Sequence, residues 1–518
     1  MRLLHTDCLV IGAGLAGSAY ALQAAKLGLS VELLSLSEPL AANSDWAQGG
    51  IIYDTAPDPA ALARDITAAS DGTANPAAVE HLVREGPHAV EEFLIEALNV
   101  GFDRDAAGAL DFTREGGHSA RRIIHAKDAT GHAILSAVAA RVDATAKITR
   151  RTGCVAIDLL TLSHNSVELA DRYEPLTCFG AYVLDTRTGE TIAIVAKKTI
   201  LATGGLGQIF LHTTNQPGSV GHGVAMAYRV GARLIDLEYV QFHPTVFAKK
   251  NAPRFLVTEA LRGEGGVLRN LRGEPFMDPI DPRGSLASRD VVARAIKQEL
   301  AASGEPHALL DLSAMPPDFI RDRFPTIFER CLAHGVDITR EPIPVVPAAH
   351  FACGGVHADL HGRTSVRHLN AIGETGCTGL HGANRLASTS LLECLVSAKF
   401  AALADGTDIV RETFRLPAPR EWESPVREAD PVLIRQDMLQ IQHTMWNYAG
   451  VVRSPKRLTR ARRILIELRE EVQSFYRGCR LTRDLIELRN AIQTALLVVH
   501  AASLNPRSKG CHYVVEEE

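Results

Sequence analysis

"TDCLVIGAGLAGSAYALQAAKLGLSVELLS", residues 6–35, decides the fold that the sequence predicts. The apolar run 8–11 predicts a strand, an alanine-rich stretch to about residue 27 predicts a helix, and 31–34 predicts a second strand. The turn between the first strand and the helix fits the pattern G-x-G-x-x-G, with Gly12, Ala13, Gly14, Leu15, Ala16 and Gly17. We therefore expect a Rossmann-like α/β domain whose helix N-terminus binds the pyrophosphate of a dinucleotide.

The three glycines of this turn have separate expected roles. Gly12 permits the tight turn, Gly14 lets the backbone approach the pyrophosphate, and Gly17 lets the helix pack on the sheet. The second strand ends in Ser35, where such folds commonly carry an acid that binds the ribose, so ribose recognition is not predicted. Further along, "KKTILATGGLGQIF" (197–210) reads as a strand that ends in small residues. It is either a plain turn or a second cofactor contact, and we favour the contact.

Length, charge and cysteine usage limit the class of protein. The 518 residues carry 22% charged residues and a formal net charge of −5, which does not favour nucleic acid or an anionic membrane as partner. No apolar run approaches the ~20 residues of a membrane span and no cleavable signal is recognisable, so we expect a cytoplasmic protein. The nine cysteines lack zinc or iron–sulfur spacing, so we expect reduced thiols and no metal.

Composition also predicts the division of the chain. Charged loops rich in Gly and Pro run from about 236 to 350 and indicate an inserted domain, after which small and apolar residues return and a helix is expected from about Ser388. The Pro-rich segment 415–425 indicates a linker to a helical tail, in which 454–476 shows helical spacing. We predict one domain from 1–236 and 351–410, a second from 237–350 and a C-terminal helical domain from 411–518.

Short stretches with unusual local sequence contain the side chains suited to chemistry. They are "QFHPT" with His243, "TEALRGEGG" with Thr258, Glu259 and Arg262, "SRDVVARA" with Arg289, "PAAHFACGG" with His350 and "GLHGANRLASTSLLE" with Arg385. Any one of them is more often an ion pair or a buried, hydrogen-bonded residue than a functional group. Together, two Arg, two His and a Thr are the donors that two carboxylates need, which predicts a small dicarboxylate ligand.

Seven motifs in this order resemble the flavoprotein family of succinate dehydrogenase and fumarate reductase: "AQGG" (47–50), "ATGG", "QFHPT", "TEALRGEG", "RDVVARA", "AHFACGGV" and "GLHGANRLAS". Within that family, "TREGGHSARRIIHAKDATG" (113–131) and "HTMWNYAGVVRS" (443–454) are most similar to the L-aspartate oxidase branch. The resemblance implies an α/β FAD-binding domain interrupted by an α+β capping domain, with the active site between them, followed by a C-terminal helical bundle.

The resemblance also implies roles for single residues. His243, Thr258, His350 and Arg385 match positions that hold substrate carboxylates, Arg289 matches an acid–base arginine at the flavin, and Glu259 and Arg262 match a proton relay behind it. FAD contacts carry over to Ala13 through Ala16, to Asn43, Ser44, Asp45, Trp46, Ala47, Gln48, Gly49 and Gly50, and to Glu374, Ser390 and Leu391.

Two positions depart from parts of that family. Asn43 stands where the membrane-bound branch carries the histidine that binds FAD covalently, so the resemblance implies non-covalent FAD. His222 stands in Gly221-His222-Gly223, where the family commonly has Gly-Asp-Gly. This difference calls the family's aspartate-to-FAD hydrogen bond into question.

Glu115 is an acid among cations in 113–131, and the succinate and fumarate enzymes lack it. The resemblance suggests that its carboxylate pairs with the α-ammonium of L-aspartate, with Gly116 and Gly117 letting the loop approach the substrate. The alternative is a surface salt bridge with Arg121 or Arg122.

The implied reaction is the oxidation of L-aspartate to iminoaspartate, the first step of quinolinate and NAD biosynthesis. Reoxidation would use oxygen, giving hydrogen peroxide, or fumarate, and transient contact with quinolinate synthase would suit an unstable imine product. Two alternatives stay open. One is a succinate dehydrogenase or fumarate reductase flavoprotein, which needs an iron–sulfur partner, and the other is an FAD-binding protein that has lost its chemistry.

Overall fold

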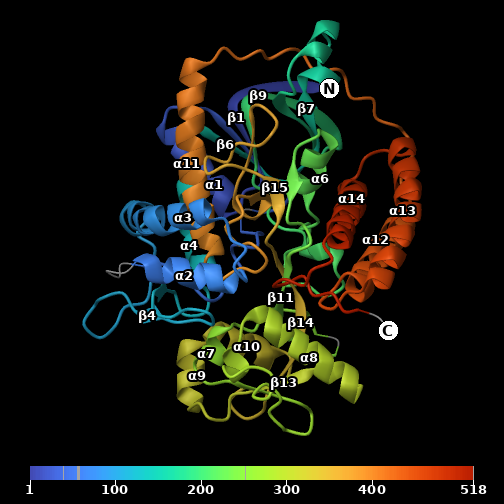
Figure 1. The fold of residues 1–518 in the computed structure, drawn as a ribbon. Coiled ribbons are helices and arrows are strands. Elements are labelled where there is room, and N and C mark those ends of the chain that lie inside the picture. The colour runs from blue at the N-terminus through green and yellow to red at the C-terminus, as the bar shows by residue number, and fades with distance from the viewer. Residues whose placement is uncertain (39, 55–58, 251, 517–518) are drawn as a thin grey trace.

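The computed structural model describes residues 1–38, 40–54, 59–250 and 252–516, and it confirms the predicted α/β class (Figure 1). The opening stretch folds as β1 (Arg2–Ile11), α1 (Leu15–Lys26) and β2 (Val31–Leu34), with β1 and β2 parallel. Gly12 has a φ of +113°, and a Cβ there would lie 2.1 Å from the carbonyl oxygen of Ala202. A Cβ on Gly17 would lie 1.9 Å from the carbonyl oxygen of Gly12. Only glycine therefore fits at either position.

The main sheet has the strand order β6-β2-β1-β9-β8-β7, and β16 also pairs with β9. Its further strands are β6 (Ile148–Arg151), β7 (Cys154–Thr161), β8 (Cys178–Asp185), β9 (Glu190–Leu201) and β16 (Leu369–Ala371). The pairs β6–β2, β2–β1, β1–β9 and β9–β16 are parallel, whereas the pairs β9–β8 and β8–β7 are antiparallel. The carboxyl ends of β1, β2 and β9 therefore meet at one edge, where ligands bind in doubly wound folds.

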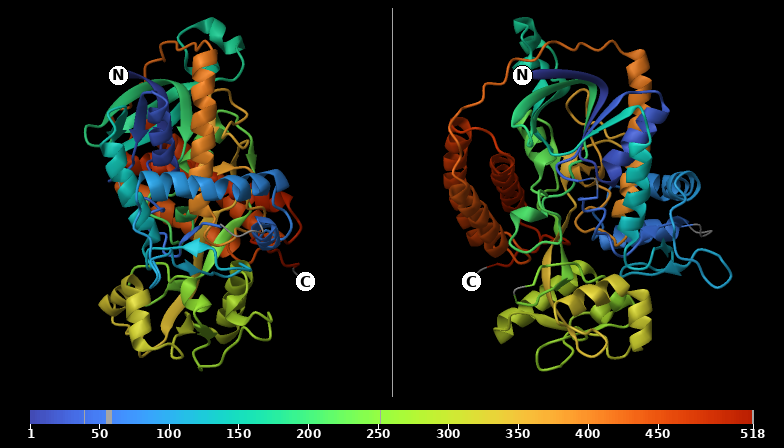
Figure 2. Two further views of the ribbon diagram at one scale, coloured as in Figure 1. Left: turned by 90° about the vertical axis from the view of Figure 1, so that its left-hand side faces the viewer. Right: turned by 180° about the vertical axis from the view of Figure 1, so that it is seen from behind.

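Helices cover both sides of this sheet. Helix α1 packs against α4 (Thr130–Asp143) and α11 (Ser390–Arg411), and α3 (Pro76–Ala89) packs against α11 and α2 (Pro59–Ala69). Residues Val90–Ala97 continue α3 as a π-helix. On the other side α6 (His222–Arg229) contacts β7 and α14 (Arg483–Leu504), so the sheet lies between α11 and the C-terminal helices (Figure 2).

A second sheet and its helices form the lower lobe in Figure 1. Its sheet has the order β11-β14-β13-β12, from β11 (Val240–Phe247), β14 (Ile343–Ala352), β13 (Ala308–Asp311) and β12 (Val267–Arg269). Its helices are α7 (Ala260–Gly263), α8 (Arg289–Ser303), α9 (Pro317–Arg323) and α10 (Pro325–Ala333). The β11–β14 ladder shifts register after His243, where Pro244 has no N–H to donate. That 237–350 is a separate domain stays a prediction.

Short strands bring distant loops together. One small sheet joins β10 (Leu234–Ile235), β15 (Gly355–His357) and β17 (Gly376–Cys377). Another joins β3 (Ile51–Ile52), β5 (Ile123–Ile124) and β4 (Phe112–Thr113). Since β3 follows Gly50 and β4 precedes Glu115, this second sheet places the two loops next to each other. A short helix, α5 (Leu162–Asn165), follows β7.

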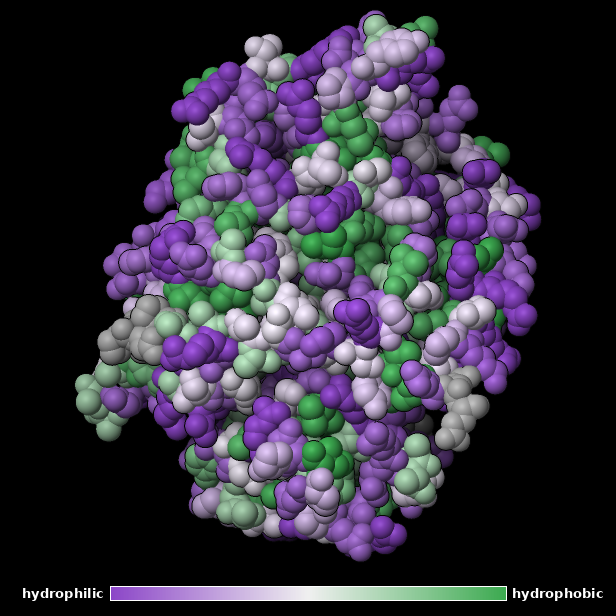
Figure 3. All heavy atoms as spheres, viewed as in Figure 1, coloured by the Kyte–Doolittle hydropathy of each residue, from purple (hydrophilic) through white to green (hydrophobic). Residues whose placement is uncertain are grey.

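The C-terminal helices are α12 (Pro431–Tyr448), α13 (Pro455–Gly478) and α14, which pack on one another. The side chains of Asp430, Ser454 and Thr482 cap them by accepting backbone N–H hydrogen bonds. Segment 412–430 crosses the top of the molecule in Figure 1. On the face in Figure 3 hydrophobic side chains are interspersed among hydrophilic ones. Among the helices of the described residues, none has the length and apolar composition that a membrane crossing requires.

Candidate active site

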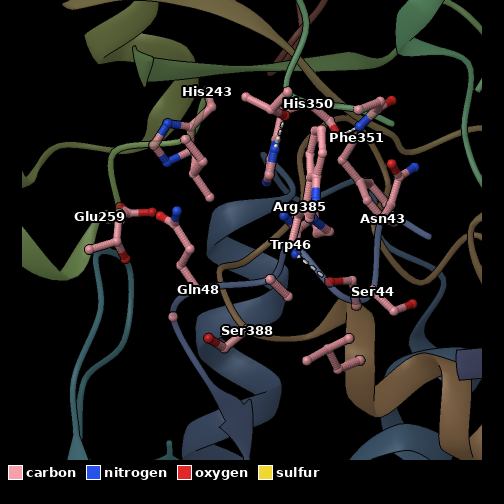
Figure 4. Close-up of a pocket in the computed structure, with 18 of the residues that line it drawn as sticks. Asn43, Ser44, Trp46, Gln48, His243, Glu259, His350, Phe351, Arg385 and Ser388 are labelled. Carbon is pink, nitrogen blue, oxygen red and sulfur yellow. Dashed lines mark hydrogen bonds between the residues drawn. The ribbon is translucent and has the colours of Figure 1, made fainter. Parts of the chain in front are cut away.

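A cavity with an empty volume of about 1000 Å³ is lined by residues of the lower lobe, such as His243 and Arg289, and by residues near the main sheet, such as Asn43 and Glu374. In Figure 4 His243 and His350 lie at the top of the view, Glu259 lies at the left beside the head of Gln48, and Ser388 lies below them. The predicted residues that line the cavity are Glu115, His243, Thr258, Glu259, Arg289, His350 and Arg385. Residues separated by up to 270 positions in the chain thus share one wall.

Arg289 is the first residue of α8 and is held on two sides. Its Nε donates to Glu259 Oε2 at 2.6 Å, and a terminal nitrogen donates to Gln241 Oε1 at 3.0 Å. The Gln241 amide nitrogen in turn donates to Asn384 Oδ1 and to the carbonyl oxygen of Arg385. Gln241 therefore joins β11, α8 and the loop that carries Arg385. We did not predict Gln241, although it belongs to the motif "QFHPT".

Arg262 lies behind the cavity and does not line it. A terminal nitrogen donates to the carbonyl oxygen of Ser285 at 2.7 Å, and another lies 3.3 Å from Glu259 Oε1. Burial raises the pKa of Glu259, but Arg289 and Arg262 outweigh burial and bring that pKa below its ordinary value. Glu259 is therefore a carboxylate that bridges two guanidinium groups.

Two neutral imidazoles face this cationic cluster. The rings of His243 and His350 are 5.2 Å apart, and His350 Nδ1 forms a 2.7 Å hydrogen bond with the hydroxyl of Thr214. Burial, followed by the charge of Arg289, lowers the pKa of both histidines well below the ordinary value. At neutral pH they offer N–H groups without adding charge.

Arg385 adds a further cation to the wall. Its guanidinium lies 4.4 Å from the ring centre of Phe351 and donates to Ser390 Oγ at 3.0 Å. Burial, then the nearby Arg289, lowers the pKa of Arg385 to about 10, so it remains charged at neutral pH. Its Nε is buried and has no hydrogen-bond partner among the described residues.

Glu115 is 5% exposed and lies in the wall of the cavity. Ser388 donates to its Oε2 at 2.5 Å, and a Cβ on Gly49 would lie 2.1 Å from its Oε1. Burial, followed by the charge of Glu259, raises the pKa of Glu115. The carboxylate is therefore desolvated and beside another acid.

The alternative of a surface salt bridge for Glu115 is excluded. Arg122 pairs with Asp54 at 3.3 Å and with Asp65 at 2.9 Å, while Arg121 donates to the carbonyl oxygen of Phe112. Ser388, the partner that the structure shows, has a φ of +57°, and the helix expected from about Ser388 is α11, which begins at Ser390.

A second cavity, of about 800 Å³, runs from the glycine turn to the first. Of the predicted cofactor residues it is lined by Gly12, Ala13, Gly14, Leu15, Ala16, Asn43, Ser44 and Glu374, and the last three also line the first cavity. Trp46, Ala47, Gln48, Gly49, Gly50, Ser390 and Leu391 line the first. Gly17 and Asp45 line neither, since Gly17 packs on Gly12 and Asp45 forms a 2.8 Å contact with His132.

The two cavities together fit an extended dinucleotide. One end lies at the start of α1, where backbone N–H groups suit phosphates. At the other end Gln48 Oε1 is buried without a hydrogen-bond partner among the described residues, so a polar group of a ligand can satisfy it. The turn after β9, from Ala202 to Gly204, lines the second cavity, where the cofactor contact that we favoured for this turn would lie.

Known proteins match nearly the whole chain. Residues 7–391 match the family described as "FAD binding domain", and 438–517 match "Fumarate reductase flavoprotein C-term". L-Aspartate oxidase 1 of Ralstonia nicotianae is 44% identical, with 98% of this chain and 95% of the relative covered. L-Aspartate oxidase of Pseudomonas aeruginosa is 43% identical over the same shares. The structure of a variant of E. coli quinol fumarate reductase FrdA is 25% identical, with a TM-score of 0.88 over 100% of this chain and 92% of that chain.

Proposed function

The chain belongs to the L-aspartate oxidases, within the FAD-binding flavoprotein family that includes fumarate reductase, and we infer from this membership that it oxidises L-aspartate. The product is iminoaspartate, and the reaction is the first step of quinolinate and NAD biosynthesis. The cofactor is FAD. The observation that carries the choice of substrate is a buried carboxylate in the cavity wall, Glu115, whose pKa is raised, whereas the neighbouring Glu259 is paired with Arg289 and Arg262.

We propose that the cationic wall holds the two carboxylates of the substrate. Arg385 offers a charged fork, and His243, His350 and Thr258 offer neutral donors from β11, β14 and the loop before α7. This set suits a four-carbon dicarboxylate and fixes its orientation in the cavity. The bound FAD supplies the two-electron oxidation of the substrate.

Glu115 then distinguishes L-aspartate from succinate. An α-ammonium group placed in this cavity is desolvated and needs an acceptor, and the carboxylate of Glu115 provides one. Burial and the charge of Glu259 disfavour the carboxylate form of Glu115, and the positive charge of the ammonium group stabilises that form. Succinate lacks this group and would leave the carboxylate unpaired.

Arg289 and Glu259 carry out the proton transfer in this proposal. Arg289 lines the cavity, and its 2.6 Å contact with Glu259 fixes the guanidinium. Arg262 lies behind Glu259, so the three side chains form a line of alternating charge from the cavity inward. We propose that Arg289 exchanges the proton with the substrate and that Glu259 and Arg262 relay it.

Fumarate is a second ligand for the same site, because it carries the two carboxylates that the wall binds. Like succinate it brings no partner for Glu115, so we expect it to bind less tightly than L-aspartate. We propose that fumarate or oxygen, the latter giving hydrogen peroxide, serves as electron acceptor. FAD is non-covalent in this proposal, because Asn43 is an amide engaged with Ser219 and with the backbone of Gln216. Transient contact with quinolinate synthase would protect an imine product from hydrolysis.

An anaerobic experiment tests this function. The FAD-loaded protein is mixed with L-aspartate or with succinate in separate cuvettes, and bleaching of the flavin absorbance is followed. We expect rapid bleaching by L-aspartate and little by succinate. Bleaching by succinate alone would favour a dehydrogenase, and no bleaching with either would favour a protein that binds FAD without catalysing the reaction.

A further inference from the structure

His222 begins α6, directly after Gly221, which has a φ of +80°. It lines a third cavity, of about 430 Å³, which the ends of β1 and β2, the start of β7 and α6 enclose. This cavity shares Gly12, Leu36, Thr203 and Gly218 with the cavity at the glycine turn. It is therefore a continuation of the dinucleotide site, on the side of β2.

A chain of hydrogen bonds fixes the protonation of the His222 ring. Arg229, at the end of α6, donates to Asn490 Oδ1 at 2.8 Å, and a guanidinium can only donate. The other end of the Asn490 side chain is therefore its NH₂ group, which lies 2.8 Å from His222 Nδ1. His222 Nδ1 must accept this hydrogen bond, which leaves the ring proton on Nε2.

This Nε2–H group has no partner. It is buried, and among the described residues no acceptor contacts it. Burial, with a smaller contribution from Arg229, lowers the pKa of His222 to about 4, so the ring is neutral at physiological pH. One residue of the third cavity thus carries an unsatisfied, uncharged donor, and a buried donor of this kind is stable only when a ligand or water accepts from it.

We propose that His222 Nε2–H donates a hydrogen bond to the adenosine part of bound FAD. When the pyrophosphate lies at the start of α1, the adenosine extends toward the end of β2, where the third cavity lies. Adenine ring nitrogens and ribose oxygens are neutral acceptors that suit a neutral donor. An aspartate at this position could only accept when ionised, so His222 reverses the polarity of the contact.

Asn490 is a positioning residue in this arrangement. It lies on α14, so the C-terminal bundle sets the tautomer of a residue in the cofactor site. Arg229 is itself held by Asp158 at 2.6 Å, and Arg489 of α14 donates to the same carboxylate at 2.7 Å. The contact with FAD therefore depends on docking of α14 against α6 and β7.

The test measures FAD binding and no turnover, although it rests on FAD being the cofactor. The holoprotein is diluted, and the FAD released at equilibrium is measured by its fluorescence, with and without ADP as competitor. We expect His222→Ala to raise the Kd of FAD about tenfold, and that of ADP by the same factor. His222→Gln keeps an N–H donor and should restore most of the affinity.

His512→Gln is the matched control. His512 is also buried and its Nδ1 also accepts a hydrogen bond, here from Arg453, but its Nε2 already contacts the carbonyl oxygen of Asn505. We expect a lower Tm without a change in the Kd of FAD or ADP. In ¹⁵N-labelled protein, the ring nitrogens of His222 are assigned by comparison with His222→Gln. We expect a protonated Nε2 and an unprotonated Nδ1, and we expect Asn490→Leu to weaken this tautomer preference.

The proposal fails if folded His222→Ala binds FAD and ADP as the unmodified protein does. It also fails if His222→Asp, which can only accept when ionised, binds FAD more tightly than His222→Gln. A protonated Nδ1 in the labelled protein would contradict the hydrogen-bond chain itself. Because bleaching by L-aspartate is measured separately, failure here leaves the proposed function untouched, and failure of that function leaves this result intact.

Discussion

Two buried acids in one cavity have opposite environments. Glu259, in front of α7, contacts Arg289 and Arg262, and these two cations bring its pKa below the ordinary value despite burial. Glu115, between β4 and β5, receives a hydroxyl hydrogen bond from Ser388, and burial together with Glu259 raises its pKa. Two ion pairs within the protein compensate the charge of Glu259. The charge of Glu115 is not fully compensated, and a cationic group of a ligand would stabilise it.

The difference teaches how one pocket can bind two carboxylates and one ammonium. The cationic wall is common to any dicarboxylate ligand, and its acid, Glu259, serves to fix Arg289. Arg289 and Arg385 lower the pKa of Glu115 by less than burial and Glu259 raise it, so this carboxylate is under-compensated and favours a ligand that brings a positive charge. Changes on the Glu259 side should therefore affect every substrate, and changes on the Glu115 side should affect L-aspartate alone.

The largest effect is expected for Arg289→Leu. Loss of the group that exchanges the proton should lower kcat by about 10⁴-fold, both for L-aspartate oxidation and for fumarate reduction. Steady-state kinetics of the two reactions checks this. Arg294→Leu is the control on the same helix, because Arg294 pairs with Asp290 outside the cavity and should change kcat by less than about threefold. Equal losses in the two variants would contradict the role of Arg289.

Glu259→Gln should have the next largest effect. The neutral amide no longer holds Arg289, so both reactions should slow by about 10²- to 10³-fold. The pKa of Glu115 should also fall, since Glu259 is one of the charges that raises it. A loss confined to L-aspartate oxidation would break the distinction between the two acids.

The pH dependence of L-aspartate oxidation should report Glu115. Because its pKa is raised, the carboxylate form is present above that pKa and is lost as the pH falls through it. The kcat/KM for L-aspartate should then fall about tenfold per pH unit on the acid side. Measured over the same pH range, Glu115→Gln should lack this limb, and a limb that persists in the variant would assign it to another group.

Ser388→Ala should give the smallest change. Loss of the 2.5 Å hydrogen bond removes an interaction that lowers the pKa of Glu115, so the acid limb should move to higher pH. The kcat/KM for L-aspartate should fall about fivefold at neutral pH, with fumarate reduction preserved. Equal losses in both reactions would mean that Ser388 supports the cavity as a whole.

The sequence predicted what depends on local pattern. Residues 6–35 folded as strand, turn, helix and strand because their apolar spacing and glycines agree. The cationic wall could be predicted because each member lies in a distinctive short motif. What depends on tertiary contact was not predicted: Ser388 meets Glu115 across 273 positions and adopts a left-handed φ, which no local pattern indicates.

The same limit applies to residues that lie near the cavities without lining them. Arg262 belongs to a recognisable motif, yet its guanidinium turns toward Ser285 and Glu259. Asp45 lies within the predicted cofactor segment but pairs with His132. The unpaired donor on His222 follows from Arg229 and Asn490, residues on two helices that the sequence alone does not bring together.

The most direct test of the role of Glu115 is the ratio of two activities in Glu115→Gln. L-Aspartate oxidation and fumarate reduction are measured on the same FAD-loaded preparation, so that folding and cofactor content cancel. We predict that kcat/KM for L-aspartate falls by at least about 10²-fold while fumarate reduction is retained, because only L-aspartate brings an ammonium group. Equal losses in the two activities, or unchanged oxidation of L-aspartate, would contradict the assignment of Glu115 as the partner of that group.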